Sequence, residues 1–191
     1  MQSILVIGDS FSADWSVKYN DCIGWPNLLA NKFSVLNLSQ PGCSEYKIYQ
    51  QLNSANTSNF THCIVCHTSP NRIPVEVHPL HSNDVLHHSC DLIYADIENS
   101  KDPAVSSIKE YFKKYFHHEY YNYVHQLIMK DLHETLLTMS LKTMHITFFD
   151  YTNVYINKNY YQLFRKHSGF TNHLDDHGNN TVFKDLTKWI G

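Results

Sequence analysis

The sequence predicts an α/β protein with a mostly parallel sheet that is covered by helices on both faces. Short apolar runs typical of strands alternate along the chain with segments of helical character. Sharp turns follow the apolar runs after residues 7, 38 and 66, where a parallel sheet places its reactive groups. No internal repeat or linker divides the 191 residues. We therefore expect one domain over residues 1–191, with a loop-rich insertion at about residues 73–103.

Each expected element has its own local signal. The strand candidates are short apolar runs rich in β-branched residues, at 3–8, 35–38, 62–67 and 145–149. Three shorter helices are expected at 25–33, where Pro26 suits a first turn, at 45–52 and at 178–190. The strongest helical stripe of apolar residues runs from 106 to about 141 and predicts one long helix. Residues 151–172 are expected to be irregular or to hold a short helix.

Composition excludes several classes of function. Hydrophobic residues make up 42% of the chain and charged residues 17%, which is typical of a globular protein. The net charge of −3, without a basic stripe, argues against nucleic acid as a partner. No apolar run approaches the roughly 20 residues of a membrane helix, and residues 1–3 lack the basic start of a signal peptide. We therefore expect a cytoplasmic protein without a membrane partner, and five cysteines, an odd number, fit a reducing compartment.

Two segments at opposite ends of the chain carry the chemistry. Gly8-Asp9-Ser10 directly follows the first predicted strand, and His173-Leu174 stands five residues before Gly178 and the last predicted helix. A serine hydroxyl is a weak nucleophile until a base removes its proton, so neither segment means much alone. Together they resemble the first and last sequence blocks of the SGNH/GDSL hydrolases. The plain alternative is a turn serine and a capped helix start, because Asp175 and Asp176 suit a helix N-terminus.

The resemblance implies a fold, a reaction and two site residues. It implies the three-layer α/β/α, flavodoxin-like fold of that family, with Ser10 as the nucleophile and His173 as the base. The family hydrolyses esters, often acyl groups on carbohydrates or lipids, through an acyl-enzyme. It uses no cofactor, and we expect none here.

The two middle blocks of the family are matched more loosely. Residues 37–42 resemble the second block, which gives Gly42 the role of an oxyanion donor together with the backbone N–H of Ser10. The third block normally supplies an asparagine after the third strand. Asn71 is the candidate here, although it stands about two residues late, and Thr68 or Ser69 could donate instead.

The acid of the triad departs from the family pattern. It usually stands three residues before the histidine, where this chain has Phe170. Three explanations stay open: a carboxylate from elsewhere, with Asp150 at a strand end the best candidate; a backbone carbonyl that orients His173; or a degenerate enzyme. A literal D-x-x-H at 84–87 lies in the insertion, and we interpret it as coincidence.

Other clusters have simpler explanations. Cys63 and Cys66 are three apart on a strand, so their thiols should point to opposite faces as buried residues rather than form a redox or metal pair. Further histidines occur at 78, 81, 87, 88, 117 and 118. They show no recognised ligand spacing, and we expect no metal site.

The sequence hypothesis is therefore a serine esterase or deacylase acting on a small-molecule or glycan ester, such as an O-acetyl group on a carbohydrate. An acyltransferase with the same site and a catalytically degenerate binding module are the alternatives. A weaker one is an assembly protein that uses the insertion and the tyrosine-rich helix as a partner surface. The substrate and the oligomeric state are not readable from these residues.

Overall fold

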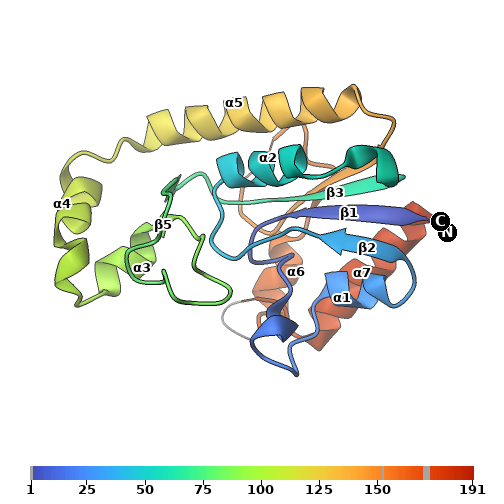
Figure 1. Cartoon of the computed structure of the whole chain (residues 1–191), viewed down its shortest axis with the longest axis horizontal. Helices are drawn as coiled ribbons and strands as arrows, with labels where there is room; N and C mark the ends of the chain where they lie inside the picture. Colours follow the sequence, from blue (N-terminus) through green and yellow to red (C-terminus); the bar gives the residue numbers. More distant parts are fainter. Residues whose placement is uncertain (1, 152, 170–172) are drawn as a thin grey trace.

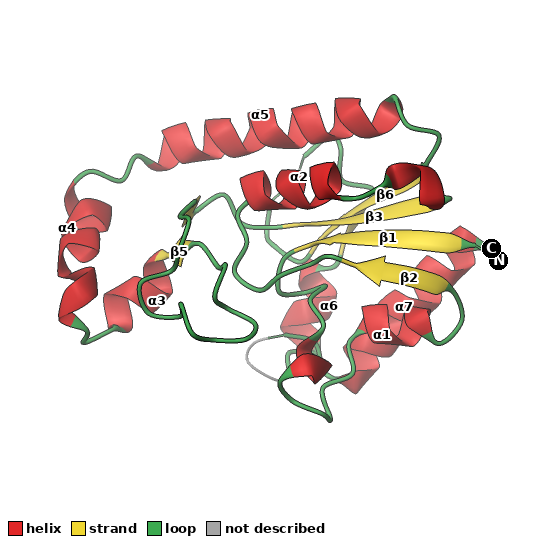
Figure 2. Cartoon of the chain, viewed as in Figure 1, coloured by secondary structure: helices red, strands yellow, loops and turns green. Residues whose placement is uncertain are grey.

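Five parallel strands form one sheet in the computed structural model, which describes residues 2–151, 153–169 and 173–191 (Figures 1 and 2). The spatial order is β2-β1-β3-β6-β7, and every neighbouring pair is parallel. The strands are β1 (Ser3–Gly8), β2 (Ser34–Asn37), β3 (His62–His67), β6 (Lys142–Thr147) and β7 (Lys158–Asn159). The predicted α/β class is confirmed.

Helices cover both faces of the sheet (Figure 2). One face packs against α1 (Trp25–Ala30), α6 (Tyr161–Lys166) and α7 (Asp176–Ile190), and the other packs against α2 (Glu45–Ser54) and α5 (His118–Leu137). Alternation along each strand divides the core, since Cys66 belongs to the α7 side and Cys63 to the α2 side. The prediction that these two thiols diverge is confirmed.

The insertion is more ordered than the sequence suggested. A two-stranded antiparallel ribbon, β4 (Arg72–Ile73) and β5 (Leu92–Ile93), closes its base, and a series of turns fills the loop between them. Beyond it lie α3 (Tyr94–Asn99) and the short 3₁₀ helix η3 (Pro103–Val105). With α4 (Ser106–Lys114) they enclose a small satellite core around Ile97 and Phe112.

The expected single helix over 106–141 is wrong, because the chain breaks it into α4 and α5. The Phe116 N–H bonds back to the Tyr111 carbonyl, which closes α4 with a wide turn. His117 then caps α5 by accepting the Tyr120 N–H on its side chain. The Phe116 ring stacks on Tyr121 with centroids 4.4 Å apart, so tertiary packing of aromatic rings overrides the helical stripe.

Other boundaries moved by a few residues. The fourth predicted strand begins and ends earlier, and within 151–172 the structure has β7 as well as a short helix. The remaining short 3₁₀ helices are η1 (Trp15–Val17) and η2 (Thr57–Asn59). No helix in the described ranges is long and apolar enough to cross a membrane.

Candidate active site

Ser10 stands on a tight turn just beyond the carboxyl end of β1, a central strand of the sheet. The turn is closed by the Ser12 N–H, which donates to the Asp9 carbonyl over 3.1 Å. The Ser10 carbonyl accepts a 2.8 Å hydrogen bond from Trp15 Nε1. Gly8 leads into the turn where the chain passes against β3, because a Cβ built there would lie 2.6 Å from the Cβ of Cys66. The backbone that presents Ser10 is therefore held from both sides.

Asp9 holds this turn in place through buried hydrogen bonds. It is fully buried and accepts hydrogen bonds from the Phe11 N–H, the Thr68 hydroxyl and the Arg72 guanidinium, at 3.0, 2.9 and 3.2 Å. Burial raises the pKa of Asp9, and the positive charge of Arg72 works against that rise. Because β3 is followed by Thr68 and Arg72, this buried pair fixes the turn after β1 to the turn after β3. We assign Asp9 a positioning role.

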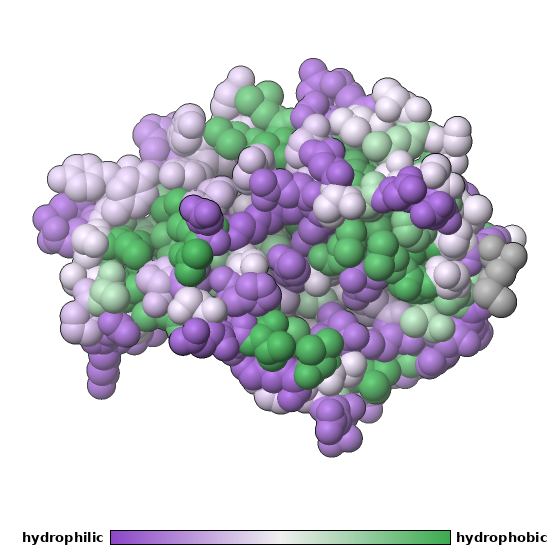
Figure 3. Space-filling model, in the orientation of Figure 1, coloured by the Kyte–Doolittle hydropathy of each residue, from purple (hydrophilic) through white to green (hydrophobic). Residues whose placement is uncertain are grey.

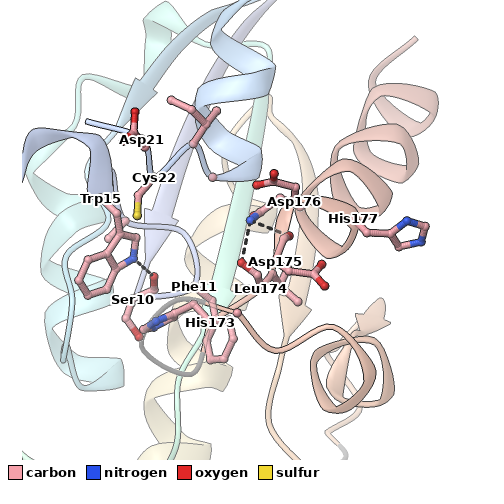
Figure 4. A pocket seen from close by; sticks show the side chains of 15 residues that line it. Ser10, Phe11, Trp15, Asp21, Cys22, His173, Leu174, Asp175, Asp176 and His177 are labelled. Carbon is pink, nitrogen blue, oxygen red and sulfur yellow. Dashed lines mark hydrogen bonds between the residues drawn. The ribbon is translucent and has the colours of Figure 1, made fainter. Parts of the chain in front are cut away.

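His173 lies across the same pocket from the other end of the sequence. A surface pocket of about 430 Å³ is lined by both Ser10 and His173, and in Figure 4 the imidazole points toward Ser10. The rings of Phe11 and Trp15 each lie 4.9 Å from the His173 ring, measured between centroids, and hold it between them. The structure thus brings together the two residues that the sequence singled out.

The start of α7 places His173. Asp175 caps that helix by accepting the Gly178 N–H over 2.7 Å, and Leu174 is buried in the core beside it. An isolated bridge pairs Ser168 with Leu174, and the Gly169 N–H donates to the His173 carbonyl. The histidine therefore sits on a backbone fixed by a helix cap on one side and a short antiparallel contact on the other.

Gly42 follows β2 in the second block, but it does not line the pocket that contains Ser10 and His173. The ladder between β1 and β2 continues past the strands, with Leu38 N–H bonding to the Val6 carbonyl and Gln40 N–H to the Gly8 carbonyl. Gly42 follows two residues later with a φ of +72°, a conformation that favours glycine. The backbone N–H groups of Gly42 and Ser10 donate to no acceptor in the described part of the chain. Gly42 is buried and packs against Cys90, so its role as an oxyanion donor stays a prediction from the sequence.

Other predicted residues are not brought to this pocket. Asn71 is exposed, and its side-chain oxygen lies 3.3 Å from Nδ1 of His118. Asp150 is exposed and does not line the pocket. The Thr68 hydroxyl is already committed to Asp9. Phe170, the residue in the position of the family's acid, lies outside the described residues. The roles of Asn71 and Asp150 stay predictions from the sequence.

Sequence reasoning missed the aromatic residues that surround the histidine. Phe11 follows the nucleophile candidate directly, and Trp15 begins the short helix η1 four residues later. The only signal was their closeness to Ser10 in the sequence, because an aromatic residue after a strand usually serves the core. Here Trp15 has two functions, since its indole N–H holds the Ser10 carbonyl while its ring packs on His173.

The buried cysteines are poor candidates for a nucleophile. All five are free, and four of them are buried. Burial raises the pKa of Cys43 and of Cys63 to about 12, so neither is a reactive thiolate near neutral pH. Cys22 is half-buried and lines the pocket, opposite the histidine in Figure 4.

Comparison with known proteins agrees with the fold. No protein-family model and no curated protein matches the sequence. Among solved structures, the chain is similar to a protein from Desulfitobacterium hafniense DCB-2 assigned to the lipolytic proteins of the G-D-S-L family. The likeness covers 98% of this chain and 99% of the other, with a TM-score of 0.52 and 12% sequence identity. At that identity the match shows a shared three-layer fold over nearly the full length.

Proposed function

We propose that the protein is a serine esterase or deacylase that uses Ser10 as its nucleophile. The observation that carries this proposal is the meeting of Ser10 and His173 in one pocket, from opposite ends of the chain. The fold shared with a lipolytic G-D-S-L protein supports it, since the serine stands at the carboxyl end of a central strand in a parallel sheet.

The reaction follows the logic of nucleophilic acyl transfer. His173 takes the Ser10 hydroxyl proton while Oγ bonds to the ester carbonyl carbon, and the carbonyl electrons move to its oxygen. Backbone N–H groups of Ser10 and Gly42 hold that oxyanion. His173 then protonates the leaving alcohol as its bond to the carbonyl carbon breaks. Water, deprotonated by His173, resolves the acyl-enzyme and releases the acid. An alcohol in place of water would make the same site an acyltransferase.

The residues that line the pocket restrict the charge of the substrate and the size of its acyl group. The apolar side chains of Trp15, Ile23 and Leu174 can accept a short acyl group, and about 430 Å³ suits a small ligand. Asp21, Asp175 and Asp176 also line the pocket and would repel an anionic substrate. Figure 3 shows an apolar patch over the region of η1, beside polar surface. We infer that the substrate is a neutral ester with a short acyl chain.

Ester hydrolysis tests the proposal directly. We expect the purified protein to hydrolyse p-nitrophenyl acetate and butyrate. Ser10→Ala should reduce kcat/KM by about a thousandfold or more, and His173→Ala by at least about a hundredfold, because each removes a group that acts in the transition state. A fluorophosphonate probe should label the intact protein and not Ser10→Ala.

His88→Ala provides the matched control, because His88 is exposed and lies outside the pocket. This variant should keep the activity of the intact protein. If the intact protein neither exceeds Ser10→Ala in hydrolysis nor takes the probe, the esterase proposal is wrong. The protein would then be a binding module on a hydrolase fold.

A further inference from the structure

Most backbone turns of the insertion span three residues. The N–H groups of residues 81, 84 and 90 donate to the carbonyls of residues 78, 81 and 87, and one four-residue turn, from the N–H of residue 88 to the carbonyl of residue 84, joins these turns. Side chains three apart in such turns lie on one side. Every third residue of this segment could ligate a metal: His78, His81, Asp84, His87 and Cys90.

Three of these side chains converge. Ligand atoms of His78, His81 and Cys90 all lie within 4.8 Å of one another. His78 is fully buried and Cys90 is 3% exposed, while His81 is half-buried. The rings of His78 and His81 stack with centroids 4.5 Å apart. Two imidazoles and one thiol from one short segment therefore meet at a single point near the surface.

His78 has a buried ring nitrogen that no group in the described residues uses. Its Nδ1 accepts the Leu80 N–H over 3.1 Å, so the neutral ring carries its proton on Nε2. That nitrogen is buried and has no hydrogen-bond partner in the described part of the chain. No protein group in the described residues competes for this nitrogen, which can ligate a metal ion once the ring proton moves to Nδ1.

We propose that His78, His81 and Cys90 bind one zinc ion. Imidazole and thiolate ligands together suit Zn²⁺ and disfavour Mg²⁺ and Ca²⁺, which take oxygen ligands. The nearby carboxylate of Asp91 is not a further ligand, since it accepts the Ser44 N–H and the Val75 N–H and pairs with Lys47. A water molecule on the half-buried His81 side would complete four-coordination.

Binding releases a proton. The Cys90 S–H bond breaks, sulfur keeps the electron pair for the bond to Zn²⁺, and the proton passes to solvent. At His78 the metal takes the place of the Nε2 proton, which moves to Nδ1, so the Leu80 contact opens. No oxidant or reductant is needed, because zinc keeps its charge.

The position of this cluster gives the metal a role beyond the insertion. A Cβ built on Gly42 would lie 2.5 Å from the Cβ of Cys90, so Cys90 packs directly on the proposed oxyanion donor. On the other side, the His87 ring lies 5.6 Å from the Trp15 ring, which in turn contacts His173. A zinc ion that fixes the turns from 78 to 90 would stiffen both contacts to the candidate active site.

Metal binding tests the proposal without reference to activity. Tag-free protein, treated with a chelator and desalted, should bind one Zn²⁺ per chain as measured by elemental analysis. With Co²⁺ in place of Zn²⁺ it should show a thiolate-to-metal charge-transfer band. Cys90→Ala should abolish that band, and His81→Ala should weaken metal affinity by about a hundredfold or more.

The control separates this site from adventitious binding by other histidines. His88→Ala removes an exposed histidine next to the cluster and should bind one metal ion as the intact protein does. The His81 side chain is half-buried, so His81→Ala decides the question even if Cys90→Ala folds poorly. Cobalt binding without a thiolate band, or unchanged affinity in His81→Ala, would overturn the proposal.

Discussion

Gly8 shows at the scale of one residue how tightly the nucleophile's turn is built. A Cβ at this position would lie 2.4 Å from the Ser12 hydroxyl and 2.7 Å from the Cys66 carbonyl oxygen. The Gln51 side chain also accepts the Gly8 N–H and donates to its carbonyl. Gly8→Ala should therefore push β1 away from β3 and lower the free energy of unfolding by about 2–3 kcal/mol. Urea denaturation measures this loss.

Gly24→Ala provides the comparison, because it is the same substitution at a glycine with more space around it. The nearest atom to a Cβ built there is 3.3 Å away, on Pro26, so we expect a cost below about 1 kcal/mol. Equal stability of Gly8→Ala and the intact protein would show that the contact between β1 and β3 is looser than these distances indicate.

Helix α7 carries the base at the scale of an element. Its capping residue, Asp175, accepts the Gly178 N–H, and this hydrogen bond is the main cause of the lowered pKa of Asp175. Asp175→Ala should cost about 1 kcal/mol of stability, because an N–H of the first turn loses its acceptor. Asp175→Asn keeps an acceptor oxygen and should restore most of that loss. Thermal or urea unfolding of the two variants makes the comparison.

Asp176 lies one residue further, inside the first turn, and its side chain is exposed. Asp176→Ala should change stability by less than Asp175→Ala, because it removes only a favourable charge near the helix N-terminus. A larger effect from Asp176 than from Asp175 would contradict the assignment of the cap.

Elements with a strong local signal were predictable from the sequence. The strand at 62–67 agrees residue for residue, because a short apolar run bounded by turns leaves little choice. The break at Tyr115–His117 was not predictable, since it depends on Phe116 packing against Tyr121, a contact made only after the chain turns. The same holds for the insertion, whose turns follow neither a helical nor a strand period, so the sequence does not reveal that His78 and Cys90 meet.

The candidate site was predictable only where its residues belong to contiguous sequence motifs. Ser10 and His173 belong to contiguous motifs, and both reach one pocket. Asn71 was placed by counting residues after β3, but the chain enters the β4–β5 ribbon at Arg72, and the side chain of Asn71 faces α5. Positions that depend on how a loop leaves the sheet cannot be counted along the sequence.

A buried chain of imidazoles links four elements of the fold, from α2 through β3 and β6 to α5. Oε1 of Glu45 lies 2.6 Å from Nδ1 of His67, whose Nε2 lies 2.8 Å from Nδ1 of His145. Nε2 of His145 lies 3.2 Å from Nδ1 of the half-buried His133. Each of these contacts pairs a donor N–H with an acceptor, and a neutral His145 can accept at one ring nitrogen while it donates through the other.

This arrangement predicts a loss of stability in mild acid. Burial, followed by the charges of His67 and His133, lowers the pKa of His145 to about 2, whereas the unfolded histidine titrates near 6.5. Below about pH 6.5 the unfolded state binds a proton at this histidine, and the folded state does not. The free energy of unfolding therefore decreases as the pH decreases. From pH 7 to pH 5, His145 alone should lower the free energy of unfolding by about 2 kcal/mol.

Other groups add to this loss or lie outside its window. Burial also lowers the pKa of His125, which acts in the same direction. For Glu45, burial acts to raise the pKa, but the charge and hydrogen bond of His67 leave it lowered. Glu45 therefore makes its full contribution to the free energy of unfolding above pH 5, and this contribution is lost only in stronger acid.

Urea unfolding at pH 7 and pH 5 measures the effect. His145→Asn removes the titrating ring, and although it should lower stability at both pH values, the difference between them should shrink by about 2 kcal/mol. His118→Ala, which removes an exposed histidine on α5, should leave that difference unchanged. If His145→Asn keeps the full pH dependence, His145 is protonated in the folded protein and the assignment of a neutral ring is wrong.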